Sequence, residues 1–143
     1  MFEKTIQNPY LGTLTSQGQC KTWEVECQIN GFDDEFSFQV WGDKNGLMPH
    51  QEIAVRQLFE NIKNIKENAT LPMINFWQGI EFLEDYFPNT ILENREAIWQ
   101  YLHPAYSEIR DNGEIALGFV YYIGDYLVFL KVMDGQFKEI GTE

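Results

Sequence analysis

The sequence predicts an α+β fold, because segments with strand periodicity at both ends of the chain enclose a helical middle. Apolar and polar residues alternate from Thr22 to Ile29, apolar residues recur at helical spacing from residue 49 onward, and strand-like runs return from residue 115. We therefore expect an antiparallel sheet built from N- and C-terminal strand hairpins, with a central group of about three helices packed on one face. A length of 143 residues is usual for one domain, so residues 1–143 are expected to form a single α+β domain.

The clearest hairpin is predicted within residues 22–41. Asn30-Gly31 separates two strand-like runs, and both of these residues tolerate positive φ, as a two-residue hairpin turn requires. A turn at that place makes Val25 face Phe36 across the two strands.

Further strands are predicted from shorter runs of the same kind, and the last three are separated by Gly-Asp and Asp-Gly dipeptides typical of tight turns. The run before the last is apolar on both faces, as in a strand covered on both sides, so the helices are expected to cover one face of this sheet. These predicted strands are Phe2–Gln7, Tyr10–Thr15, Ile115–Ile123, Tyr126–Met133 and Phe137–Ile140.

Three helices are predicted in the middle of the chain. The first begins at Pro49, which suits a first helical turn, and is interrupted at Leu71-Pro72. The second is expected over Met73–Phe87 and is stopped by the proline that follows it. The third opens with the capping-box spacing of Thr90 and Glu93 and ends near His103-Pro104.

The charge is strongly acidic, with 22 acidic and 10 basic residues and a net charge of −12. Such a surface repels phosphate backbones, so a nucleic-acid partner is not expected. It attracts basic proteins instead, although solubility alone also accounts for an acidic composition. The longest apolar stretch, Ala116–Met133, is interrupted by glycines and charged residues, and no N-terminal targeting signal is visible. We expect no membrane association and a cytoplasmic location.

No catalytic residue, metal site or cofactor site is predicted. His50 and His103 are the only histidines, and neither has a cysteine at ligand spacing. Cys20 and Cys27 fall in one predicted strand, where an odd spacing puts them on opposite faces, so they are not expected to form a disulfide. His103 and Ser107 lie close in sequence but lack a nucleophile-elbow motif. The chain is therefore expected not to be an enzyme.

The candidate binding surface lies on the second predicted helix. Three of its carboxylates are spaced so that they share one helix face, where their mutual repulsion would be relieved by a basic partner. Two aromatic residues beside the apolar stripe are expected to be exposed and to act as contact residues. A merely solvated face is the competing interpretation. The candidate residues are Trp77, Glu81, Glu84, Asp85 and Tyr86.

The chain also resembles a family of uncharacterised bacterial domains, some of them encoded beside toxin genes and regarded as immunity proteins. The resemblance rests on Leu11-Gly12-Thr13-Leu14, Trp23, the helical middle and the closing segment 132–141. A Trp-Asp-x-Glu-His-Gly run that is frequent in the family is replaced here by Tyr122-Ile123-Gly124-Asp125-Tyr126, so a role tied to that run does not carry over. The resemblance implies a fold and a genomic setting.

Together these observations favour a non-enzymatic, acidic protein-binding module, such as an immunity protein that neutralises a basic toxin. Two alternatives remain open. One is a small hydrolase-like enzyme whose site, a carboxylate beside His50 or His103, is assembled only in three dimensions. The other is a housekeeping domain that holds an apolar ligand between helices and sheet. An exposed edge strand and the exposed aromatics are equally compatible with a homodimer.

Overall fold

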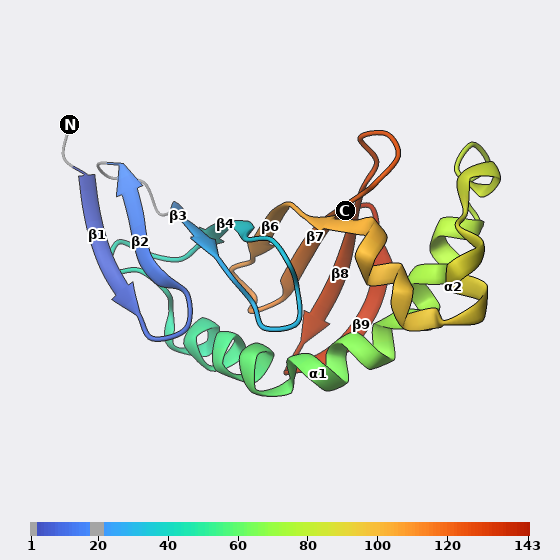
Figure 1. Ribbon diagram of the computed structural model, residues 1–143. Coiled ribbons are helices and arrows are strands. Elements are labelled where there is room, and N and C mark those ends of the chain that lie inside the picture. Colours follow the sequence, from blue (N-terminus) through green and yellow to red (C-terminus); the bar gives the residue numbers. More distant parts are fainter. Residues whose placement is uncertain (1–2, 18–21) are drawn as a thin grey trace.

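The computed structural model describes residues 3–17 and 22–143 and confirms the α+β class (Figure 1). Nine strands among those residues join in one sheet, and a long helix crosses one of its faces. The strands are β1 (Glu3–Asn8), β2 (Gly12–Gln17), β3 (Thr22–Cys27), β4 (Phe36–Trp41), β5 (Leu102–Pro104), β6 (Tyr106–Ile109), β7 (Ile115–Tyr121), β8 (Leu127–Met133) and β9 (Gln136–Gly141). The helical segments are α1 (Pro49–Gln78), η1 (Glu84–Tyr86), α2 (Asn89–Glu93) and η2 (Arg95–Tyr101), of which η1 and η2 are 3-10 helices.

The sheet is larger than two hairpins, and a parallel pair of strands joins its two halves. Its order is β1-β2-β3-β4-β6-β7-β8-β9, with β5 pairing beside β6 on β7. Every pair is antiparallel except β4 with β6, in which Ser37–Val40 run alongside Tyr106–Ile109. The sequence pattern did not predict β5 or β6, because both are short and β5 ends in Pro104.

The predicted pairing of the first hairpin is wrong by two residues. Val25 lies opposite Phe38, and Cys27 lies opposite Phe36, with a connection from residue 28 to residue 35 in place of a two-residue turn. Because side chains alternate with a period of two, this shift keeps the apolar side chains of both strands on the predicted face. The consecutive acidic residues Asp33-Asp34-Glu35 lie exposed in the connection and do not continue the strand.

The predicted interruption at Leu71-Pro72 is also wrong, because α1 is one helix of 30 residues that includes Pro72. A proline inside a helix costs about 3 kcal/mol, since it removes one hydrogen bond and crowds the preceding turn. Met73, Ile74 and Trp77, which follow it, are all buried against the sheet. Burial of each such side chain contributes about 1.5–3 kcal/mol, so together they outweigh the proline penalty.

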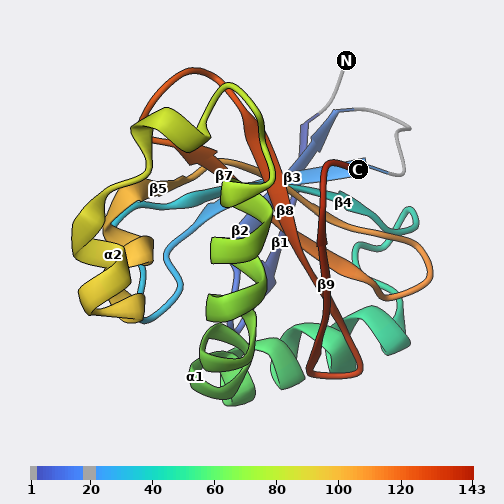
Figure 2. The same ribbon diagram turned by 90° about the vertical axis from the view of Figure 1, so that its right-hand side faces the viewer.

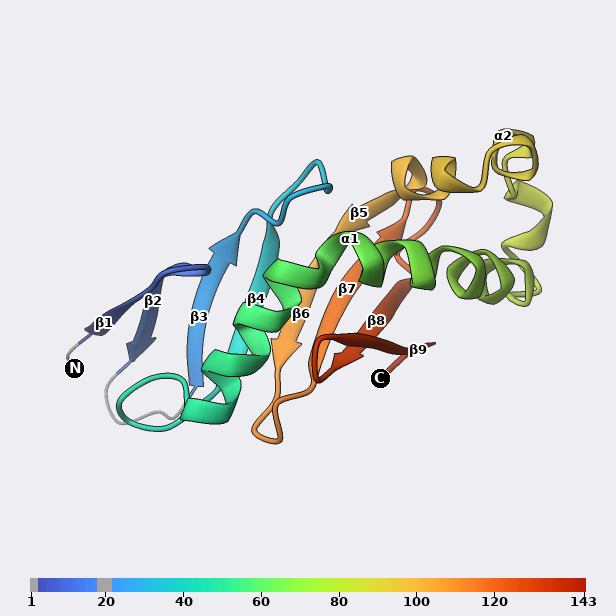
Figure 3. The same ribbon diagram turned by 90° about the horizontal axis from the view of Figure 1, so that it is seen from below.

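The remaining helical segments differ from the predicted second and third helices. The chain leaves α1 at Gly79, makes a turn, and forms only the three residues of η1 before Pro88. The predicted third helix is divided between α2 and η2 at Asn94, whose side chain accepts a hydrogen bond from the backbone N–H of Glu96 at 3.3 Å. These segments gather beyond one end of the sheet and are not central (Figures 2 and 3).

The core lies between α1 and the sheet, and its centre is aromatic. The ring of Phe119 contacts Phe32, Phe36 and Trp99 at centroid distances of 5.4–5.5 Å. In Figure 3, α1 crosses the lower face of the sheet, and no helix covers the opposite face of β3 and β4 in Figure 1. Of the two cysteines, Cys27 is buried and Cys20 lies outside the described residues, so their predicted separation stays a prediction. Among the described helices, none has the length and apolar character needed to cross a membrane.

Candidate binding surface

The predicted acidic residues lie at the end of the molecule where α1 stops. Glu81 is in the turn after α1, whereas Glu84 and Asp85 are in η1, so the three do not share the face of one helix. All three side chains are exposed. Within the described part of the chain, none of the ion pairs involves any of them. Their carboxylates are therefore free to meet a partner.

Trp77 does not lie on the surface, and its predicted exposure is wrong. The indole is fully buried and is surrounded by other aromatic rings, the closest being Tyr121 at a centroid distance of 4.5 Å. Its Nε1–H donates a hydrogen bond of 3.3 Å to the carbonyl of Leu83. Trp77 thus supports, from beneath, the turn that carries Glu81 and leads into η1.

Exposed aromatic rings lie beside the carboxylates. Tyr86 is 53% exposed, as predicted, and its backbone carbonyl accepts a hydrogen bond from the hydroxyl of Tyr122 at 3.1 Å. Phe82 is 60% exposed and contacts the ring of Tyr126 at a centroid distance of 5.8 Å. A groove of about 480 Å³ beside these rings is lined by residues from the end of α1, the following turn and Tyr126. We call Glu81, Phe82, Glu84, Asp85 and Tyr86 the acidic-aromatic end.

Phe82 was not predicted, although the sequence carries a signal for it. It falls outside the apolar stripe expected for the second helix, and a phenylalanine off the stripe points toward solvent. In the β7–β8 connection, the exposed Tyr122 and the half-buried Tyr126 carry no comparable signal, since their position depends on how that connection packs against the end of α1.

The two histidines and Ser107 each contact a different partner among the described residues. The ring nitrogen Nε2 of His50 contacts the carbonyl of Asp111, whereas His103 lies 3.8 Å from the carboxylate of Asp34 at the surface. Ser107 is buried, where its hydroxyl donates to the carbonyl of Ala105 at 3.1 Å and accepts from the backbone N–H of Gly118 at 2.8 Å. This hydroxyl therefore holds β6 and β7 together.

Cys27 and the side chains able to bind a metal were considered as further candidates for a reactive site. Burial, together with the charge of Glu35, raises the pKa of Cys27 to about 11, which keeps the thiol protonated. Within residues 3–17 and 22–143, no group of three or more His, Cys, Asp or Glu side chains is placed to hold a metal ion.

Glu114 is the one deeply buried carboxylate of an ion-pair cluster next to β7. It is 5% exposed and accepts hydrogen bonds from Arg110 and, at 2.6 Å, from Nζ of Lys138. Burial alone would raise its pKa. The hydrogen bond from Lys138 and the charges of Lys138 and Arg110 outweigh this effect and lower the pKa below the ordinary value of 4.5.

Acid is therefore expected to weaken the fold through Glu114. A carboxyl whose pKa is lower in the folded than in the unfolded state stabilises the fold fully at pH values above its unfolded pKa. For Glu114 this stabilisation is lost as the pH falls from 4.5 through the lower pKa of the folded state. We expect Glu114→Gln to lower the free energy of unfolding at pH 7 by about 1.5–3 kcal/mol and to flatten its fall in acid, measured by urea unfolding across pH. Glu139→Gln is the control, because Glu139 pairs with Lys131 at 3.5 Å and is largely exposed. An unchanged acid profile in Glu114→Gln would contradict this assignment.

No family model, curated protein or solved structure matches the chain. The resemblance to bacterial immunity domains therefore remains a prediction.

Proposed function

We propose that this chain is a non-enzymatic, acidic protein-binding module and that its acidic-aromatic end binds a basic protein, such as a toxin that it neutralises. The observation that carries the proposal is the arrangement of three exposed carboxylates, which make no ion pair within the described part of the chain, around exposed rings of Phe82 and Tyr86. Protein interfaces are enriched in aromatic anchors, and charge complementarity raises both the association rate and the specificity.

The neighbouring residues suit this role because they hold the surface in place. Trp77 fixes the turn through its hydrogen bond to Leu83, and Tyr122 fixes η1 through its hydrogen bond to Tyr86. A surface that is ordered before binding loses less conformational entropy when the partner arrives. The repulsion among the carboxylates is relieved at the same moment, so binding a cationic partner is favoured further.

The test is affinity capture from an extract of the source cells, followed by identification of the retained proteins. The variant Glu81→Gln/Glu84→Gln/Asp85→Asn removes three charges from the acidic-aromatic end. The matched control removes three exposed charges from other elements, at Asp33, Glu52 and Glu67. Both variants have the same net charge, so a difference between them reports on the local surface and not on long-range attraction.

We expect one basic protein to be retained at low ionic strength by the wild type and by the control, to be released at high ionic strength, and to be lost from the site variant. Purified partner and wild type should then form a complex whose affinity falls at least about tenfold with the site variant. Equal retention by site variant and control would reject this surface. Retention of no basic protein by the wild type would reject the proposed function.

A further inference from the structure

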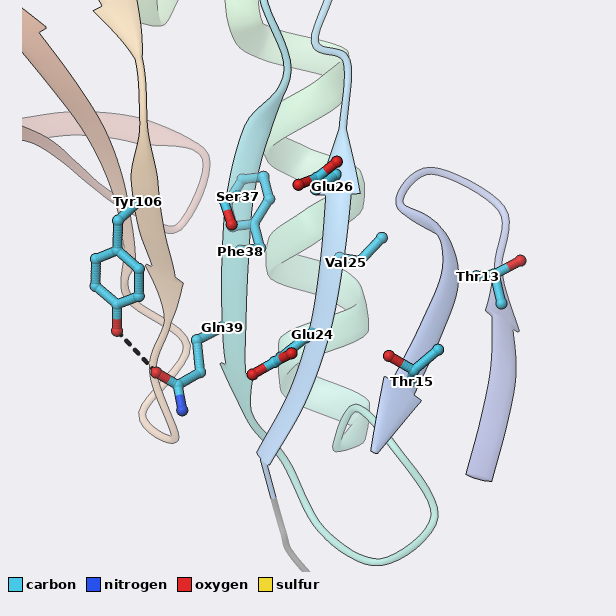
Figure 4. A pocket seen from close by; sticks show the side chains of 9 residues that line it. All are labelled: Thr13, Thr15, Glu24, Val25, Glu26, Ser37, Phe38, Gln39 and Tyr106. Atoms are coloured by element: carbon cyan, nitrogen blue, oxygen red, sulfur yellow. Dashed lines mark hydrogen bonds between the residues drawn. The ribbon is translucent and has the colours of Figure 1, made fainter. Parts of the chain in front are cut away.

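The uncovered face of the sheet carries a second polar surface, far along the chain from the acidic-aromatic end. A trough of about 380 Å³ crosses β2, β3, β4 and β6, and in Figure 4 the helix α1 lies behind the strands that carry it. Its polar side chains are shown in Figure 4. They are Thr13, Thr15, Glu24, Glu26, Ser37, Gln39 and Tyr106.

The pairing of the strands arranges these side chains in two rows. Thr15 lies opposite Glu24, Glu24 opposite Gln39, and Gln39 alongside Glu108. In the second row, two residues away on each strand, Glu26 lies opposite Ser37, and Ser37 lies alongside Tyr106. The rows are therefore about 6.6 Å apart, which is the rise of two residues in a strand.

Both rows present carboxylates that lack a cation. Glu24 and Glu26 are exposed, and no ion pair in the described part of the chain involves either of them. Glu108, in contrast, is paired with Arg110 at 3.1 Å. The trough as a whole is negatively charged.

The trough also has spare acceptor capacity. The hydroxyl of Tyr106 lies 2.9 Å from Oε1 of Gln39 and 2.8 Å from Oε2 of Glu108. A phenol has one proton, so it donates to one of these oxygens at a time and leaves the other able to accept from a ligand. Ligands rich in N–H donors therefore fit this surface.

Charge and polarity decide between the occupants that could cover such a face. A second copy of this chain would bring its own Glu24 and Glu26 toward the same carboxylates if the two faces met, which like charges oppose. An amphipathic helix would place apolar side chains on hydroxyls, amides and carboxylates, and these groups would lose water without gaining partners. A positively charged, extended segment avoids both the repulsion between like charges and the burial of polar groups without hydrogen-bond partners.

We propose that the trough binds an extended segment of a partner protein that carries arginine at alternate positions. Side chains two residues apart in an extended chain lie on the same side and are separated by the same 6.6 Å, roughly, as Glu24 and Glu26. The planar guanidinium group donates two parallel hydrogen bonds to a carboxylate, which a lysine ammonium group cannot do. This inference does not depend on the proposed function of the acidic-aromatic end.

Two peptides of the same composition and charge test the spacing. One is acetyl-Gly-Arg-Ser-Arg-Gly-amide, with alternate arginines, and the other is acetyl-Gly-Arg-Arg-Ser-Gly-amide, with adjacent ones. Each is titrated into the isotope-labelled full chain, and the amide shifts are followed by NMR. We expect the first peptide to shift residues of β3 and β4 and to bind more tightly than the second.

The variant Glu24→Gln/Glu26→Gln is expected to weaken binding of the first peptide about tenfold, which corresponds to two lost surface ion pairs. The matched control Glu52→Gln/Glu67→Gln removes two exposed charges of α1 and should leave that affinity unchanged. Equal binding of the two peptides, equal binding by the two variants, or shifts confined to the acidic-aromatic end would each overturn the proposal. Failure here leaves the capture experiment on the acidic-aromatic end unaffected, so the two proposals are judged separately.

Discussion

Replacing Trp77 by alanine is expected to lower the free energy of unfolding by about 3–5 kcal/mol. The indole is fully buried, and its removal leaves a cavity among the rings of Phe87, Tyr121 and Tyr122. The carbonyl of Leu83 also loses its hydrogen-bond donor. Urea unfolding followed by far-UV circular dichroism measures the change without depending on the fluorescence of the deleted tryptophan.

Tyr86→Ala is the matched control for this experiment. Tyr86 is 53% exposed, and the contact it makes with Tyr122 uses its backbone carbonyl, which the substitution retains. We expect this variant to lose less than about 1 kcal/mol of stability while it weakens partner binding. A Trp77→Ala protein as stable as Tyr86→Ala would show that the indole does not support the end of α1.

Gly118→Ala is expected to be the most damaging single-methyl change, with a loss of about 3 kcal/mol in the free energy of unfolding. A Cβ atom at Gly118 would lie 1.7 Å from the backbone oxygen of Tyr106, where no side chain can rotate away. The strands β6 and β7 would have to move apart at this point. Thermal and urea unfolding of the purified variant would measure the loss.

The control for Gly118→Ala is Gly79→Ala, because a Cβ there meets nothing closer than 3.5 Å and φ is −80°. Alanine has the lower conformational entropy in the unfolded chain, so this change is expected to be neutral or to stabilise by up to about 1 kcal/mol. Two alanine variants of equal stability would disprove the close approach of β6 and β7.

The buried stripe of α1 shows why part of the site was predicted incorrectly. Counting onward from Leu58 and Ile65 at helical spacing, the stripe continues through Ala69 and Met73 to Trp77. Pro72 indicates a break, and a separate second helix that begins after it places Trp77 beside the apolar stripe, toward solvent. The local signal for a helix end was genuine, but burial of the residues beyond it decided the structure.

Other features were predictable for a physical reason. The apolar faces of β3 and β4 are predicted correctly although the turn is not, because a shift of two residues in the pairing leaves every side chain on the same face. The exposure of Glu81, Glu84 and Asp85 follows from the cost of burying charge, whatever secondary structure they adopt. The pairing of β4 with β6, by contrast, joins segments far apart in the chain, and neither segment carries a pattern that specifies its partner.

The parallel pairing of β4 with β6 has a consequence while the chain is being synthesised. The apolar strand β4 leaves the ribosome early, but the strand that covers its free edge follows only after α1 and the shorter helical segments have been made. Until then, Phe36, Phe38 and Val40 belong to an unprotected strand edge, which can pair with another nascent chain. Pairing of truncated chains through the edge of β4 is therefore expected to cease once residues 106–109 are included.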